Sequence, residues 1–189
     1  MKEVEITVQV FNSLEEINNI LVLKGFNLIE KYHMTDWYFS KLDDVSKLGY
    51  AELMNKSFLV RYRDDKKYMC LCYKKKDFDL DGNVISEEKL LANTPDTLTA
   101  VKIFQSAGLN NYCVVENDSY VYKNDSIMFA VQVIKNCGIF IELEENESMR
   151  KMNETKKFNY MKSIVNSLGL NLGKDYSCKK VFMLLHNCD

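Results

Sequence analysis

The sequence predicts an α+β protein in which antiparallel strands close into a barrel, with flanking helices and a helical C-terminal segment. Three observations lead to this fold class. Eight or nine segments have strand-like composition, and most of them follow one another as hairpins. Two helices begin at capping signals between these strands, and the chain after about residue 147 has helical periodicity. Consecutive antiparallel strands in this number are expected to close, because closure removes exposed edge strands.

The first strand, at residues 3–11, alternates almost perfectly. Glu3, Glu5, Thr7 and Gln9 share one face, and branched aliphatic residues occupy the other. One face of this strand is therefore polar and carries two carboxylates.

Both internal helices are marked at their ends. Ser13 and Glu16 have the spacing of a capping box, apolar residues then recur at helical spacing, and Gly25 is a stop signal. The second helix begins at Thr94-Pro95-Asp96, with proline at the first helical position, and runs to Gly108.

The other elements follow from hairpin and turn signals. The clearest hairpin joins residues 57–64 and 67–76 through a polar turn, whereas residues 42–56 form an ambiguous connection. Further strands are expected at about 26–33, 36–41, 84–92, 111–117, 118–123, 126–135 and 138–144. C-terminal helices are expected at about 148–168 and 177–186.

Length and composition favour one ordinary globular domain. A chain of 189 residues can bury the core of one domain, and it contains no proline-rich linker. We expect the barrel to cover about 1–146 and a helical cap to cover about 147–189.

The charge and residue usage exclude several classes of protein. A formal charge of -2 lacks the basic excess of a nucleic-acid-binding protein. We expect no signal peptide, because the first residues form a charged amphipathic strand, and no apolar run is long enough to span a membrane, so a cytoplasmic location is expected. The six cysteines are expected to be free thiols, and two histidines are too few for a typical zinc site.

Polar residues fall on one face of several predicted strands. Acidic pairs occur on the first and last strands, and basic pairs lie between them in sequence; the members are Glu3 and Glu5, Arg61 and Arg63, Lys74 and Lys76, and Glu142 and Glu144. These faces could simply contact solvent while the opposite faces form the core. Alternatively, they could line one lumen in which carboxylates bind a hard cation and basic side chains bind phosphate. Alternation also directs one of Glu87 and Glu88 inward, without indicating which.

The order of short motifs along the chain resembles the CYTH superfamily, the triphosphate tunnel metalloenzymes. These motifs are Glu3-x-Glu5, Asp36-Trp37-Tyr38-Phe39, Leu59-Val60-Arg61-Tyr62-Arg63, Tyr73-Lys74 and Gly138-x-Phe140-x-Glu142-x-Glu144. The superfamily includes class IV adenylyl cyclases, thiamine triphosphatases and inorganic triphosphatases. The ending at Asp175-Tyr176-Ser177, followed by an apolar helix, looks most like the bacterial class IV cyclases.

This resemblance implies a closed antiparallel eight-stranded tunnel that binds a triphosphate-containing small molecule with Mg²⁺ or Mn²⁺. The metal ligands implied by position are Glu3, Glu5, Glu142 and Glu144. The phosphate contacts implied are Arg61, Arg63, Lys74 and Lys76. In such a mechanism no side chain of the protein is needed as a nucleophile. The chain could also form a homodimer.

Three places depart from the family pattern. Thr7 stands where the family has a lysine, and Gln132 stands where it has an aspartate. A family Lys-x-Arg falls on Glu116-Asn117-Asp118, which would reverse two charges.

Two functions therefore stay open. The first is a divalent-metal-dependent adenylyl cyclase or triphosphatase acting on a nucleotide or polyphosphate. The alternative is a catalytically inactive module that binds a phosphorylated ligand or a protein, with Glu116 and Asp118 neutralising the basic residues across the lumen.

Overall fold

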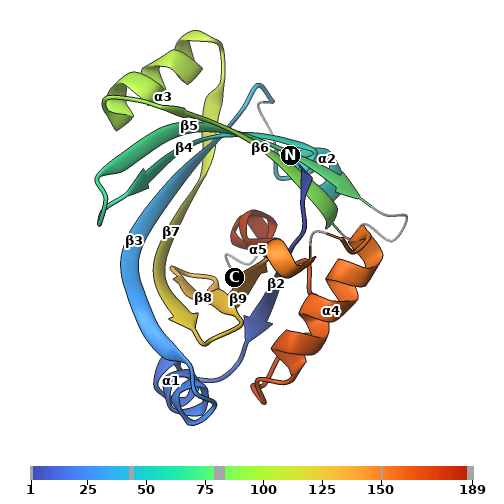
Figure 1. Cartoon of the computed structure of the whole chain (residues 1–189). Coiled ribbons are helices and arrows are strands. Elements are labelled where there is room, and N and C mark those ends of the chain that lie inside the picture. The colour runs from blue at the N-terminus through green and yellow to red at the C-terminus, as the bar shows by residue number, and fades with distance from the viewer. Residues whose placement is uncertain (1, 43–44, 79–83, 150, 187–189) are drawn as a thin grey trace.

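Antiparallel strands curl around a central space in the computed structural model, which describes residues 2–42, 45–78, 84–149 and 151–186 (Figure 1). The nine strands of these residues lie in the order β1-β6-β5-β4-β3-β7-β8-β9-β2. Their bounds are β1 Lys2–Glu3, β2 Glu5–Val10, β3 Asn27–Ser40, β4 Lys56–Arg63, β5 Tyr68–Phe78, β6 Val84–Asn93, β7 Asn110–Lys123, β8 Met128–Ile134 and β9 Gly138–Glu144. The helices are α1 Leu14–Leu23, α2 Tyr50–Met54, α3 Thr97–Ser106, α4 Glu154–Asn166 and α5 Lys180–His186, with a 3₁₀ turn at Glu147–Met149.

The predicted closed eight-stranded barrel is wrong in one respect, because the sheet is open. Its two edges are β1 and β2, which only Val4 separates in sequence. β1 pairs with β6, whereas β2 pairs with β9. The N-terminal segment thus divides between two neighbours at Val4. No strand pairing joins the two edges of the described sheet, and the chain through Val4 connects them covalently.

Two pairs of predicted strands are each one long strand. β3 replaces the strands expected at 26–33 and 36–41, and β7 replaces those expected at 111–117 and 118–123. The two long strands pair with each other from Asn27 to Ser40, and two irregularities in register interrupt the ladder without ending it. The predicted gap at 34–35 is continuous strand, because Met34 and Thr35 pair in regular register with Asn117 and Glu116, and the register shifts lie elsewhere, at Leu28/Glu30 and Tyr38/Phe39.

The helix termini match their sequence signals closely. Ser13 and Glu16 form the expected capping box, and Gly25 follows α1 with φ of 80°. The second helix begins at Thr97 with Asp96 as its N-cap, so the prediction that Pro95 is the first helical residue is wrong. Among the described residues, no helix is long and apolar enough to cross a bilayer.

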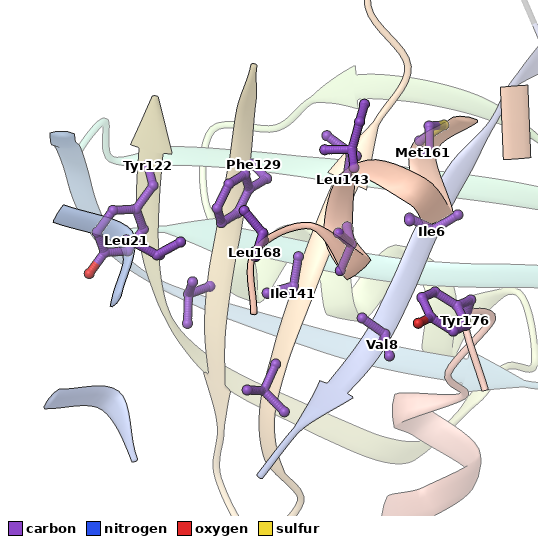
Figure 2. Packing of buried hydrophobic residues seen from close by; sticks show 14 of the residues in the cluster. Ile6, Val8, Leu21, Tyr122, Phe129, Ile141, Leu143, Met161, Leu168 and Tyr176 are labelled. Atoms are coloured by element: carbon purple, nitrogen blue, oxygen red, sulfur yellow. The ribbon is translucent and has the colours of Figure 1, made fainter. Parts of the chain in front are cut away.

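The main apolar core lies outside the curled sheet. Ile6 and Val8 of β2 and Ile141 and Leu143 of β9 are almost fully buried, in one cluster with Met161 of α4. Figure 2 shows these side chains between the strands and the helical segment. Residues at odd positions of β2 and even positions of β9 must therefore face the central space.

A second apolar cluster fills part of the inner side. Leu59, Val115, Ile134 and Phe140 of the strands belong to it together with Val181 of α5. Figure 1 shows α5 inside the outline of the strands, whereas α1, α3 and α4 lie outside it. The helical tail thus covers apolar inner-face residues next to the polar ones. The cysteines in the described residues are free thiols, as expected; Cys188 lies outside those residues.

Candidate functional site

A cavity of about 480 Å³ lies on the inner face of the sheet. Its described lining carries eight basic and four acidic side chains: Arg61, Arg63, Lys66, Lys74, Lys76, Lys89, Lys179, Lys180, and Glu5, Asp36, Glu142, Glu144. The polar strand faces therefore line one space, as the lumen interpretation expects, and most of these side chains are partly or fully shielded from solvent.

Three of the four glutamates singled out from the sequence converge in this cavity. Glu5 of β2 lies opposite Glu144 of β9 in the ladder, and the next pair on the same face is Thr7 with Glu142. One carboxylate oxygen from each of Glu5, Glu142 and Glu144 lies within 4.8 Å of the others. Such an all-oxygen set suits a hard divalent cation. Glu3 pairs through its backbone with Glu87 of β6, and its side chain lies outside the described part of the structure.

Lysines accompany every one of these carboxylates. Lys89 Nζ lies 3.4 Å from a Glu5 oxygen and 3.2 Å from a Glu144 oxygen. Lys76 Nζ lies 3.7 Å from Glu5, and Lys180 Nζ lies 2.6 Å from Glu142. The carboxylate cluster is thus neutralised from within the protein.

The three carboxylates differ in how readily they ionise. Burial opposes ionisation of Glu5 and Glu142, but the neighbouring lysines outweigh it and hold both pKa values below the ordinary glutamate value. The pKa of Glu144 is raised, because burial together with the charges of Glu142 and Glu5 outweighs the attraction of Lys89. Two carboxylates of the cluster therefore stay ionised, and the third resists ionisation.

Glu87 occupies the centre of a lysine triad and is the inward-facing member of the Glu87-Glu88 pair. Its side chain is 1% exposed, and its oxygens lie 3.2 to 3.3 Å from the ammonium groups of Lys74, Lys76 and Lys89. Burial would raise the pKa of Glu87, but these lysines lower it overall. Burial alone would lower the pKa of Lys76 and Lys89, but nearby anionic groups, including Glu5 and Glu87, outweigh burial, and both pKa values are raised.

Both predicted phosphate-binding arginines line the cavity, and both have carboxylate partners. Arg61 binds Asp36 on the paired strand with two hydrogen bonds, Nε to Oδ1 at 2.7 Å and Nη2 to Oδ2 at 2.6 Å. Arg63 binds Asp65 and Glu30, and its guanidinium lies 3.5 Å from the ring centre of Tyr32. These contacts fix both guanidinium planes and occupy the Nε–Nη2 edge of each arginine, so the remaining Nη1 donors are the ones that a phosphate oxygen would reach.

Comparison with known proteins finds similar chains among proteins described as putative adenylate cyclases. No family model matches the chain. A Methanocaldococcus jannaschii protein described as a "putative adenylate cyclase" is 25% identical over 186 residues, which cover 98% of each chain. A solved structure from Pyrococcus horikoshii has a TM-score of 0.71 at 19% identity, covering 96% of this chain and 99% of that one. A solved Hippeastrum structure, described as a "putative adenylyl cyclase" with dominant triphosphatase activity, has a TM-score of 0.60 at 15% identity, covering 98% and 95%.

The resemblance to the CYTH superfamily is confirmed. Two of the departures from the CYTH pattern sit inside the cavity. Thr7 is 5% exposed, and Gln132 is 2% exposed and donates from its amide nitrogen to a Glu142 oxygen at 3.2 Å. The amide oxygen of Gln132 accepts a hydrogen bond from Lys180 at 2.6 Å. Gln132 therefore positions Glu142 and Lys180.

The third departure from the CYTH pattern is Glu116-Asn117-Asp118, and its two acidic side chains do not lie where the sequence analysis expected them. Glu116 pairs with Lys135, and Asp118 pairs with His33 at 2.8 Å, so neither points into the cavity. The residues of β7 that line the cavity are Val115 and Asn117. The expectation that Glu116 and Asp118 neutralise the lumen is therefore wrong, because alternation along β7 puts them on the other face.

Sequence reasoning assigned no site role to five charged residues that line the cavity: Asp36, Lys66, Lys89, Lys179 and Lys180. Lys89 could have been found, since it lies two residues after Glu87 and must share its face. Lys180 had no such signal, because only long-range packing of α5 brings it to the strands.

Proposed function

We propose that this chain binds a triphosphate compound, a nucleotide or a polyphosphate, together with Mg²⁺ or Mn²⁺, and catalyses attack at phosphorus. The observation that carries the proposal is one cavity in which three carboxylates converge within 4.8 Å beside a band of lysines and arginines. The adenylate cyclase description of the Methanocaldococcus relative and the triphosphatase activity of the Hippeastrum protein favour this reaction class.

The donor set fits such a cation. Glu5, Glu142 and Glu144 would hold it, with Glu3 as a further proposed ligand. When bound, the cation would neutralise charge on the phosphate oxygens as the leaving group departs. The cavity volume lies within the usual range for small-molecule sites.

The protein's own cations would hold and orient the triphosphate. Arg61 and Arg63 present planar, pre-oriented guanidinium groups, and Lys74 and Lys76 contribute ammonium groups from the adjacent strand β5. Lys74 and Lys76 are only 12% and 11% exposed, so their attraction for phosphate is weakly screened. In a cyclase the attacking group would be a hydroxyl of the substrate, and in a triphosphatase it would be water; either reaction releases a phosphate or pyrophosphate that these residues bind.

A second candidate function is a catalytically inactive binding module for a phosphorylated ligand. The observation that favours it is the internal pairing of the cavity's charges, with Asp36 on Arg61 and Glu87 among three lysines. A site of this kind would prefer a ligand with fewer negative charges than a triphosphate.

Calorimetry of Mn²⁺ with ATP and with tripolyphosphate separates the two functions. The samples are the wild type, the double variant Arg61→Ala/Arg63→Ala, and the control Lys135→Ala, which removes a cation outside the cavity. The same samples are assayed for phosphate, pyrophosphate and cyclic AMP. The enzyme proposal expects metal-dependent binding and product in the wild type and the control, both lost in the double variant. Binding without product favours the binding module, and no binding of either triphosphate by folded wild type rejects the enzyme and leaves a module for a less charged phosphorylated ligand.

A further inference from the structure

Lys180 and Gln132 together bind the carboxylate of Glu142, which is one of the three candidate metal ligands. The ammonium group of Lys180 donates to Glu142 Oε2 and to Gln132 Oε1, each at 2.6 Å. Gln132 in turn donates to the other oxygen of Glu142 at 3.2 Å. Both oxygens of this carboxylate are therefore engaged by protein groups.

The position of Lys180 is fixed by the helix that carries it. It is the first residue of α5, and the following residue, Val181, is 4% exposed in the inner apolar cluster. The ring of Phe182 packs edge-on to Tyr50, and His186 hydrogen-bonds through Nε2 to the backbone oxygen of Ser46 at 3.0 Å. The ammonium group is therefore tethered at the cluster, unlike a counter-ion from solution.

We infer that Lys180 is a built-in counter-ion that competes with the divalent cation for Glu142 and becomes a phosphate ligand when the triphosphate binds. The inference rests on the proposed function for its two ligands. One ammonium and one divalent cation cannot share the same carboxylate oxygens without repulsion. A triphosphate supplies the ammonium with other anionic oxygens in the same cavity. Cation and triphosphate thus bind cooperatively, and each strengthens the other by the same factor.

The neighbouring lysine provides a matched control. Lys179 has the same charge and also lines the cavity, but its ammonium group lies 4.7 Å from the ring centre of Tyr50, and no described carboxylate pairs with it. Substitution by methionine removes the charge and keeps a long apolar stem at either position.

The first experiment measures Mn²⁺ affinity without nucleotide, from the electron paramagnetic resonance signal of free Mn²⁺. Lys180→Met should bind Mn²⁺ about tenfold more tightly than wild type, and Lys179→Met should stay within about threefold. Glu142→Gln should lose affinity, which locates the ion. Unchanged or weaker binding by Lys180→Met overturns the inference, as does the absence of Mn²⁺ binding by every variant. Thermal melts check folding, and Lys180→Gln repeats the test if the methionine variant is unfolded.

The second experiment tests the release of Lys180 with tripolyphosphate in the presence of EDTA. Glu142→Gln should tighten binding about tenfold in the wild-type background and by less than about threefold in the Lys180→Met background, since no lysine is left to release. Equal tightening in both backgrounds would show a general loss of negative charge and overturn this part. Neither experiment uses turnover, so an inactive but binding wild type would defeat the proposed enzyme and leave the counter-ion inference to be judged by its own data.

Discussion

The two faces of the same strands have opposite physical characters. On β2 and β9, Ile6 and Leu143 point outward into an apolar core against α4, while Glu5 and Glu142 point inward to the charged cavity. Adjacent residues of one strand therefore lie in the two different environments. The outer face stabilises the fold by burial of apolar surface, and the inner face keeps charges that stabilise one another only in pairs. A shift of one residue in register would exchange the two, so the apolar face also fixes the position of the site.

The outer face should show the largest effect on stability. Leu143 is 1% exposed and lies between the two inward-facing glutamates in sequence. Leu143→Ala should lower the free energy of unfolding by about 3 kcal/mol, because it removes buried apolar contacts and leaves a cavity. Urea denaturation provides the measurement. Leu23→Ala is the matched control, since Leu23 is 87% exposed; an equal loss in both variants would contradict the assignment of the core to this face.

The inner face should respond to the loss of one paired charge. Glu87→Gln leaves Lys74, Lys76 and Lys89 with one anion fewer, and we expect a loss of about 2 kcal/mol at pH 7. This is less than the outer-face effect, because the lysines are 11 to 20% exposed and keep some access to water. Urea denaturation again measures it. Tripolyphosphate should raise the free energy of unfolding more in Glu87→Gln than in wild type, since the phosphate oxygens replace the missing carboxylate.

The effect of Glu87 should depend on pH in a definite direction. Its pKa in the folded protein lies below the ordinary value of 4.5, because the surrounding lysines outweigh burial. A carboxyl group of this kind stabilises the fold fully above pH 4.5, and the contribution is lost as the pH falls below that value. The difference in stability between wild type and Glu87→Gln should therefore narrow in acid. A difference that widens between pH 5 and pH 3.5 would contradict the lowered pKa.

Anion binding compares the two faces within one strand. Lys74 lines the cavity, whereas the next residue, Lys75, is exposed on the other face of β5. Lys74→Met should weaken tripolyphosphate binding about tenfold, which is roughly 1.4 kcal/mol. Lys75→Met should change the affinity by less than about twofold, because solvent and salt screen a surface charge. Isothermal calorimetry at fixed salt measures both. Equal losses in the two variants would indicate general electrostatic attraction in place of a defined site.

Local patterns in the sequence located much of this arrangement. Strand alternation groups Glu5 with Thr7, and Glu142 with Glu144, because the rule depends only on neighbouring residues. The open edge at Val4 and the position of Lys180 depend on which strands and helices meet in space, and no local pattern encodes those contacts. The order of motifs gave the resemblance but not the strand face of Glu116, since order along the chain carries no information on which side a residue points.

The corrected face of β7 gives the smallest expected effect and tests the comparison most strictly. Glu116 and Asp118 pair with Lys135 and His33 outside the cavity, where both carboxylates are substantially exposed. Exposed pairs of this kind contribute about 0 to 1 kcal/mol to stability. The double variant Glu116→Gln/Asp118→Asn should therefore bind tripolyphosphate within about twofold of wild type by calorimetry at physiological salt, because the Debye length of about 8 Å screens charges on the far face. If these residues instead neutralised the lumen, their removal would tighten anion binding about tenfold or more. That result would return both side chains to the inner face and reverse the alternation assigned to β7.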